Sequence, residues 1–380
     1  MNMSDFEPNW QIEKIEWAAL PGKRARHAGS NARIGEHGVD VPLHLARITI
    51  AGQEGYGWSR ISKPLAQELV GQKTRDLFNE RGTVREEFRG IELPLFDWIG
   101  RVQGKPLNSL LSAGGTVQEK VACYDTSLYF DDLHLSDERA AVEFMQMEAL
   151  EGKNRGQANF KLKVGRGGRH MPLMEGTKRD IAIIRGIREV AGPHGKIMID
   201  ANNGYNLNLT KHVLQETADV QLYWIEEAFH EDAELYKDLK MWMRKAGMNV
   251  LIADGEGLAA PPLVQWAKEG IIDVVQYDVL VPGFSYWLEL GPELDAAHVK
   301  SAPHSYGTPY GHYVLSHLAS AIEGFQFVEW DQIEVEGMDA SGYRVKDGFV
   351  HVPAEPGFGL NFDSAYVSKW VQETGWTTSL

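Results

Sequence analysis

The sequence has a single cysteine, Cys123, in 380 residues. One thiol excludes an intrachain disulfide and any metal centre built from clustered cysteines. Because Cys123 follows the strand-like run 119–122, we expect its thiol to pack inertly rather than to react.

The sequence also lacks an excess of positive charge and any long apolar run. Its 38 Lys and Arg residues face 53 Asp and Glu residues, which gives a net charge of −15. Nucleic acids and membrane surfaces would repel such a chain, so we expect neither as a partner. No apolar run approaches the length of a membrane span, and residues 1–7 lack the basic start and apolar middle of a signal peptide. These features predict a cytoplasmic protein.

From Val117 onward the sequence alternates between strand-like and helix-like segments. The strands are expected at 119–124, 158–163, 196–200, 222–226, 249–253, 272–277, 298–302 and 325–329. The helices are expected at 134–151, 175–191, 208–217, 232–246, 262–268, 284–297 and 311–322. Such alternation predicts parallel strands joined by right-handed crossovers, and eight strands can close into a barrel.

The segments before and after this alternation predict a second, smaller domain. The strands there are expected within 9–21 and 41–59, the helices within 64–78 and 84–111, and a loop at Gly22–Arg33. Gly114-Gly115 marks the expected boundary. After Glu329 the alternation ends, and 342–352 predicts a strand pair in a tail that returns to the first domain.

Polar residues follow the expected barrel strands at their carboxyl ends. Lys161 and Lys163 lie two apart on one strand, so both side chains face the same side. Asp200, Glu226 and Glu256 end or follow three later strands. Converging carboxylates repel one another, and an all-oxygen set favours Mg²⁺ over zinc. Asp254 remains an alternative third ligand at this point.

An aspartate and a histidine follow the next two strands. Because adjacent barrel strands bring their carboxyl ends together, Asp278 can accept a hydrogen bond from His304 and raise its basicity. Together with the metal and the lysine pair, this dyad suits removal of the proton α to a carboxylate. Lys163 would be the base, with its pKa lowered by nearby positive charge; Lys161 would stabilise the enolate, and His304 would be a second base or an acid.

The lysine pair, the three carboxylates and the dyad together resemble the mandelate racemase subgroup of the enolase superfamily. The resemblance implies an α/β fold with a (β/α)₇β TIM-like barrel under an α+β capping domain, divided as 1–115 (cap), 116–330 (barrel) and 331–380 (returning tail). It also implies that Glu329 hydrogen-bonds the substrate carboxylate, that Glu256 is the third ligand, and that the loop at Gly22–Arg33 is a specificity flap. Pro94 and Ala228 depart from the residues that the subgroup usually has, but neither is an expected ligand.

The substrate is expected to be a small polyhydroxy carboxylate. Arg24, Arg26 and His27 in the flap, together with Asn202, are candidate contacts to it, and a second basic segment at 166–170 is similarly polar. The resemblance implies dehydration of a sugar acid, an aldonate or an aldarate, to a 2-keto-3-deoxy acid by a homo-oligomeric enzyme. A racemase or epimerase acting by 1,1-proton transfer is the alternative reaction, and a catalytically silent sugar-acid binding protein is the alternative class.

Overall fold

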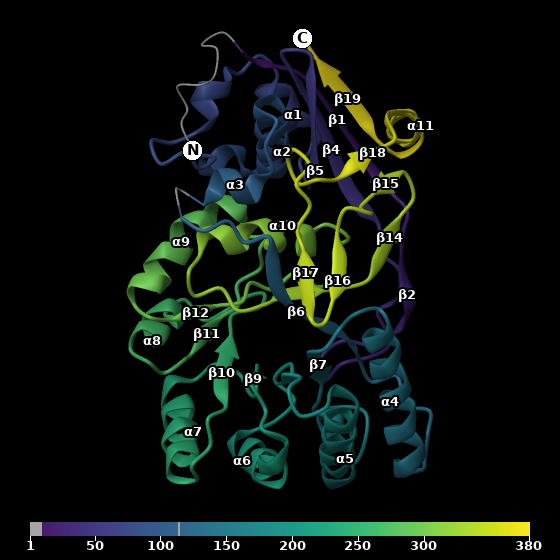
Figure 1. The fold of residues 1–380 in the computed structure, drawn as a ribbon, viewed down its shortest axis with the longest axis vertical. Coiled ribbons are helices and arrows are strands. Elements are labelled where there is room, and N and C mark those ends of the chain that lie inside the picture. Colours follow the sequence, from purple (N-terminus) through teal and green to yellow (C-terminus); the bar gives the residue numbers. More distant parts are fainter. Residues whose placement is uncertain (1–9, 113–114) are drawn as a thin grey trace.

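The computed structural model describes residues 10–112 and 115–380. Gly114, half of the predicted domain boundary, lies outside these residues, as does the start of the predicted strand 9–21. Figure 1 shows an antiparallel sheet with the C-terminus at one end of the molecule and parallel strands with their helices at the other.

A parallel sheet is built from strands that lie between residues 120 and 330. In spatial order its strands are β12 (Lys300–Ser301), β11 (Val274–Val275), β10 (Leu251–Asp254), β9 (Trp224–Glu226), β8 (Ile197–Asp200), β7 (Phe160–Lys163) and β6 (Lys120–Leu128). β13 (Val328–Trp330) pairs parallel with β6, and one parallel bridge joins Ser301 of β12 to Phe325. All eight predicted strands are therefore present, each within a few residues of its expected position.

Helices follow these strands, as the alternation predicted. They are α4 (Glu138–Asn154), α5 (Leu173–Ala191), α6 (Leu207–Glu216), α7 (Ala233–Lys245), α8 (Leu263–Lys268), α9 (Phe284–Ala296) and α10 (Gly311–Leu318). α7 illustrates the local causes: the Asp232 side chain accepts two backbone N–H groups of its first turn, and Tyr236, Leu239 and Met243 form the buried face. In Figure 1, α4 to α7 lie on the outer side of the strands.

The inner side of the parallel strands carries its own apolar cluster. The cluster contains Tyr124, Met198, Trp224, Ala253, Val274, Ala302 and Phe327, from β6, β8, β9, β10, β11 and two further strand-end positions. Tyr124 and Trp224 meet edge to face, with their ring centroids 5.7 Å apart. This cluster fills the space below the polar strand ends and so forms the floor of the site described below.

The second sheet is antiparallel and joins the two ends of the chain. Its order is β19 (Trp376–Ser379), β1 (Ile12–Leu20), β4 (Leu43–Ile50) and β5 (Gln53–Trp58). Three helices pack on this sheet: α1 (Lys63–Leu69), α2 (Glu92–Gln103) and α11 (Ser364–Thr374). α3 (Leu107–Leu111) packs instead on α2 and α10. α2 packs closely on β5 because Gly57 has no side chain there: a Cβ would lie 2.6 Å from the Pro94 Cδ.

Short elements complete the chain. The 3₁₀ turns are Thr74–Leu77, Glu86–Ile91, Arg166–Gly168, Ala218–Val220 and Ala319–Ala321, so the predicted helical stretches 64–78 and 84–111 are each interrupted. β15 (Met338–Asp339) pairs with β18 (Asn361–Phe362). β16 (Arg344–Lys346) and β17 (Phe349–His351) form the predicted strand pair in the tail, and β17 continues the pairing onto β6.

The segment expected to be a basic loop is largely a strand. β2 (Gly22–Ala28) pairs with β3 (Gly38–Asp40) and with β14 (Ile333–Val335) of the tail. Only residues 29–37 form a connection beyond it. The loop prediction for residues 22–28 was therefore wrong. Arg24 is one of the buried residues of this strand, at a position where an apolar residue is usual. The segment therefore lacks the alternation of apolar and polar residues by which a strand is recognised in a sequence.

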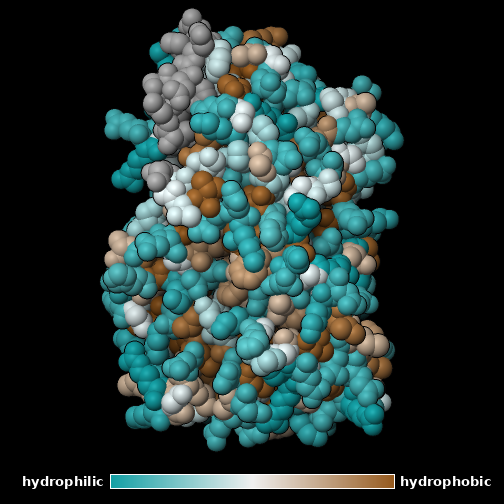
Figure 2. All heavy atoms as spheres, viewed as in Figure 1, coloured by the Kyte–Doolittle hydropathy of each residue, from teal (hydrophilic) through white to brown (hydrophobic). Residues whose placement is uncertain are grey.

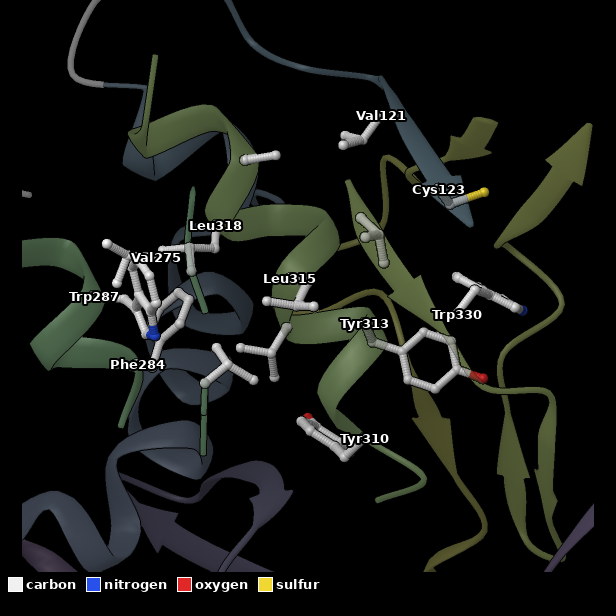
Figure 3. Packing of buried hydrophobic residues seen from close by; sticks show 14 of the residues in the cluster. Val121, Cys123, Val275, Phe284, Trp287, Tyr310, Tyr313, Leu315, Leu318 and Trp330 are labelled. Carbon is white, nitrogen blue, oxygen red and sulfur yellow. The ribbon is translucent and has the colours of Figure 1, made fainter. Parts of the chain in front are cut away.

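In the main hydrophobic core, α10 packs together with residues of β6 and β13. Figure 3 shows Tyr313 of α10 beside Trp330, while Leu315 and Leu318 point toward other buried residues of the cluster. Cys123 projects from β6 within this core, and burial raises the pKa of its thiol. Its predicted inert role agrees with this position.

One face of the molecule is mainly hydrophilic. In the view of Figure 2, hydrophilic side chains cover most of the face, with apolar residues scattered between them. Within residues 10–112 and 115–380, no helix is both long and apolar enough to cross a membrane.

Candidate active site

The polar ends of β7, β8 and β9 meet at one edge of the parallel sheet. Lys163 lies opposite Asp200, and Asp200 lies opposite Glu226, because the three strands pair in register. Lys161 shares the inner face of β7 with Lys163. These four side chains are at most 4% exposed. The lysine pair and two of the predicted ligands therefore converge above the aromatic floor.

Asp200, Glu226 and Glu256 form a cluster that could hold a metal ion. One carboxylate oxygen from each residue lies within 4.8 Å of the others. Asp254, the alternative ligand, is engaged elsewhere: one of its oxygens accepts from the Tyr236 hydroxyl and the other from a backbone N–H. The geometry thus favours Glu256 as the third member of the cluster.

The electrostatics of the cluster fit a divalent cation. Burial raises the pKa of Glu226 to about 7, and the nearby Asp200 carboxylate adds to this rise. Burial and the Glu256 carboxylate raise the pKa of Glu227 to about 8. Among the described residues, Glu256 Oε2 is buried without a hydrogen-bond partner. Crowded carboxylate oxygens, one of them without a hydrogen-bond partner, match the preference of Mg²⁺ for oxygen ligands.

Both lysines are held by the same carboxylates. Lys161 Nζ lies 2.8 Å from Glu226 and 2.8 Å from Glu329, while Lys163 Nζ donates to Asp200. Burial opposes the charge of Lys163, and so does the nearby Lys161. The carboxylates of Asp200, Glu256 and Glu226 together outweigh both effects, so the pKa of Lys163 is raised. The expected lowering of this pKa relied on a metal ion as well as on Lys161, because a cation bound by the carboxylates would offset their charge, and it stays a prediction.

His304 and Asp278 form the predicted dyad. His304 Nδ1 lies 2.6 Å from Asp278 Oδ1, and its Nε2 faces Glu256 at 3.6 Å and Glu329 at 3.7 Å. Burial lowers the pKa of His304, but the carboxylates of Glu256, Glu329 and Asp278 outweigh it and raise the pKa to about 10. His304 therefore carries a proton at neutral pH and can donate it from Nε2.

Glu329 is surrounded by donors. Its carboxylate accepts from Lys161, from the Thr126 hydroxyl at 2.8 Å, and from the backbone N–H groups of Ser305 and Tyr306 at 2.7 and 3.0 Å. Burial opposes its ionisation, but Lys161 and these donors hold the pKa of Glu329 well below its usual range. As a permanent anion it accepts hydrogen bonds and fixes Lys161 in place.

The first flap residue, Arg24, is bound within the protein. Its Nε lies 3.3 Å from Asp331, and its guanidinium lies over the Tyr306 ring, 4.7 Å from the centroid. Arg24 is 8% exposed and Asp331 2%. This position leaves little of the Arg24 charge for a substrate.

The other two flap residues lie away from the carboxylates. Arg26 donates to the carbonyl and hydroxyl of Ser127 and to the Glu148 carbonyl. His27 is half-exposed and faces Asp131 at 3.6 Å. The structure therefore does not bring Arg26 or His27 together with the cluster, which does not support their expected role as substrate contacts.

The second basic segment is also mainly structural. Arg166 is fully buried, with its guanidinium 2.5 Å from Asp132 and 2.7 Å from Asp180. Arg169 donates to the Arg33 carbonyl at 2.5 Å. The charge of Arg166 is neutralised by two buried aspartates, so it does not face a substrate.

Asn202, the remaining candidate substrate contact, lies next to the carboxylate cluster. Its backbone N–H donates to Asp200 at 2.9 Å and its side-chain amide to Glu227 at 2.9 Å. Three residues at this edge were not predicted: Glu227, Arg33, which lies 3.6 Å from Glu256, and Gln276, whose amide donates to Glu226 at 2.9 Å. Gln276 follows β11 at a strand end, which is the signal that located the other residues.

Comparison with known proteins adds a family and close relatives. Residues 145–366 match the family described as "Enolase C-terminal domain-like". The galacturonate dehydratase of Geobacillus sp., solved with D-galacturonate and 5-keto-4-deoxy-D-galacturonate, is 57% identical; the match covers 98% of this chain and 100% of that chain, with a TM-score of 0.96.

Two further relatives have related descriptions. A mandelate racemase/muconate lactonizing protein of Geobacillus sp. Y412MC10, solved with magnesium and tartrate, is 56% identical over the full length of both chains, with a TM-score of 0.98. D-galactarolactone cycloisomerase of Agrobacterium fabrum is 27% identical, over 72% of this chain and 76% of its own.

Proposed function

We infer the reaction from the premise that this chain belongs to the enolase C-terminal domain-like family, within the mandelate racemase subgroup of the enolase superfamily. It is a magnesium-dependent sugar-acid dehydratase, a carbon–oxygen lyase. The observation that carries this conclusion is the placement of Lys163 and protonated His304 around one buried carboxylate cluster. A base and an acid at one centre are what loss of water requires.

Asp200, Glu226 and Glu256 would hold the metal. When bound, Mg²⁺ supplies positive charge that stabilises the enolate form of the substrate carboxylate. Lys161, fixed between Glu226 and Glu329, adds a second positive group at the same place. Glu329 acts by holding Lys161 in place. Its hydrogen bond to the substrate carboxylate stays a prediction from the resemblance, because it requires a proton that the ionised Glu329 does not carry.

Lys163 would remove the proton from the α carbon, a role that requires a neutral Nζ; the charge of a metal held by Asp200 would lower the pKa of Lys163 for this purpose. The pair of electrons of that C–H bond enters the enolate, and the proton moves to Nζ. His304 Nε2 would then donate its proton to the β-hydroxyl, which leaves as water as the C–O bond breaks. Asp278 accepts from Nδ1 and keeps Nε2 directed toward the cluster. The resulting enol becomes a keto acid with a deoxygenated β carbon.

We propose a hexuronate such as D-galacturonate as the substrate, because a relative 57% identical over nearly the whole chain has been solved with it. In a uronate the carboxylate is C6, so the α and β carbons are C5 and C4. Dehydration then gives the 5-keto-4-deoxy acid, which is the 2-keto-3-deoxy pattern counted from the carboxylate. Arg24 and Arg166 are each paired with aspartates inside the protein. Neither guanidinium is therefore left to bind the second carboxylate of an aldarate.

Incubation with Mg²⁺ and D-galacturonate tests this proposal. The expected product gives a semicarbazone absorbance and a mass 18 lower than that of the substrate. Exchange of the α proton with solvent deuterium without a keto product would instead establish the alternative, a racemase or epimerase. If hexuronates, aldonates and aldarates show no turnover and no α-proton exchange, the dehydratase and the racemase are both contradicted. Binding of one of these acids without turnover or exchange would indicate the silent binding protein.

The remaining parts of the architecture are also proposals. We propose that the parallel strands close as a (β/α)₇β barrel, supported by the β13–β6 pairing, the Ser301–Phe325 bridge and the shared inner cluster. The division into 1–115, 116–330 and 331–380 is supported by the pairing of β19 with β1. A homo-oligomer without nucleic-acid partners and a cytoplasmic location stay predictions from the sequence.

A further inference from the structure

Glu227 joins two parts of the molecule that lie far apart in the sequence. Its Oε2 accepts from Asn202 Nδ2 at 2.9 Å, and its Oε1 faces the Arg33 guanidinium at 3.7 Å. Asn202 follows β8, while Arg33 belongs to the connection between β2 and β3. Glu227 therefore connects the capping segment to a residue beside the metal cluster.

The backbone around this contact is in an unfavourable conformation. Glu227 has φ 41° and Asn202 has φ 41°, in the left-handed region that non-glycine residues rarely adopt. The Glu227 carbonyl accepts from the Asn203 N–H at 2.8 Å, which holds the two strand ends together. Backbone strain of this kind is retained where it places a side chain for function.

The contact fixes how the Asn202 amide is turned. Its Nδ2 is used by Glu227, so its Oδ1 is directed elsewhere; Oδ1 is buried and has no hydrogen-bond partner among the described residues. A buried acceptor without a donor is unfavourable unless a ligand supplies one. A substrate hydroxyl is such a donor. The backbone N–H of Asn202 donates a hydrogen bond to Asp200, and this contact places the Oδ1 acceptor next to the metal cluster.

We propose that Glu227 is a positioning residue that orients Asn202 so that Oδ1 accepts a hydrogen bond from a substrate hydroxyl. The inference rests on the proposed dehydratase function. Arg33 keeps Glu227 in place from the solvent side, since its backbone N–H donates to Asn31 at 2.9 Å and its carbonyl accepts from Arg169. Hydroxyl recognition thus depends on an acidic residue that itself does not touch the substrate.

A double-mutant cycle at saturating Mg²⁺ tests this role. In Glu227→Gln the neutral amide can donate as well as accept, so it no longer selects one orientation of Asn202. We expect KM for D-galacturonate to rise and kcat/KM to fall about tenfold, the value of one hydrogen bond. The same substitution in the Asn202→Ala background should have no further effect. Glu234→Gln, on exposed α7 surface, is the matched control and should behave as wild type.

Additive losses from Glu227→Gln and Asn202→Ala would overturn the proposal, because they would show that Glu227 does not act through Asn202. If Glu227→Gln does not fold, the cycle is run with Arg33→Gln, whose side chain is 43% exposed. Arg33→Gln should then raise KM by less than is expected for Glu227→Gln, and it should have no effect on KM in the Asn202→Ala background. Wild-type turnover is measured first, so an inactive wild type contradicts the proposed function, whereas additivity in an active enzyme contradicts only this inference.

Discussion

Asp278 and His304 are joined twice, through their backbones and through their side chains. The two residues form a parallel bridge just beyond β11 and β12, in which the His304 carbonyl accepts from the Val279 N–H at 3.0 Å. The side-chain contact of 2.6 Å follows from this placement. The orientation of the proposed acid is therefore fixed by the sheet itself rather than by a mobile loop.

Replacement of Asp278 by Asn should change the pH dependence of turnover. The carboxylates of Glu256, Glu329 and Asp278 outweigh burial and raise the pKa of His304 to about 10, so His304 is protonated at neutral pH. Loss of the Asp278 charge should lower this pKa by roughly one to three units. The alkaline limb of the plot of kcat against pH should then move to lower pH. The measurement is the rate at which the 2-keto product forms at each pH. A variant with an unchanged alkaline limb would contradict the acid role of His304.

Replacement of Lys163 by Ala should remove the base. We expect α-proton exchange and turnover to fall by at least about a hundredfold, which is the usual contribution of a positioned base. The measurement is deuterium incorporation at the α carbon by NMR. Lys178→Ala, an exposed lysine on α5, should leave both rates unchanged. Full exchange in Lys163→Ala would assign the base to another residue.

The sequence was sufficient to predict the strand ends but not the surroundings of Arg24. Lys163, Asp200 and Glu226 follow apolar runs, and register between parallel strands brings such ends together without further information. Arg24 was expected in a flap because the segment 22–33 is basic and contains glycine. Its partner Asp331 lies 307 residues away in the sequence, and no local pattern reveals such a pairing.

The pKa of Lys163 could not be predicted for a similar reason. The direction of its shift depends on the balance between burial and Lys161, which lower the pKa, and the carboxylates of Asp200, Glu256 and Glu226, which raise it. The roles of Glu227 and Arg33 depend on two carboxylate oxygens facing different partners, which is a property of the folded geometry alone.

Magnesium binding should release protons and weaken as the pH falls. Burial raises the pKa of Glu226 to about 7 without the ion, so a proton competes with the metal below that pH. We expect a weaker apparent affinity at pH 6 than at pH 8, measured by calorimetry in two buffers of different ionisation enthalpy. Glu226→Gln should lose both the binding and the proton release. A pH-independent affinity would contradict this ligand set.

Replacement of Arg24 by Gln separates a structural role from substrate binding. The pair with Asp331 is buried on both sides, so removing Arg24 leaves an unpaired carboxylate and should cost about 3 kcal/mol of the free energy of unfolding. Burial already raises the pKa of Asp331 to about 6 with Arg24 present, and loss of Arg24 raises it further. A raised carboxyl pKa removes stability as the pH rises, so the deficit relative to wild type should be larger at pH 8 than at pH 5. Urea unfolding at both pH values measures it, with the exposed Arg60→Gln as the control. A raised KM without loss of stability would show instead that Arg24 contacts the substrate.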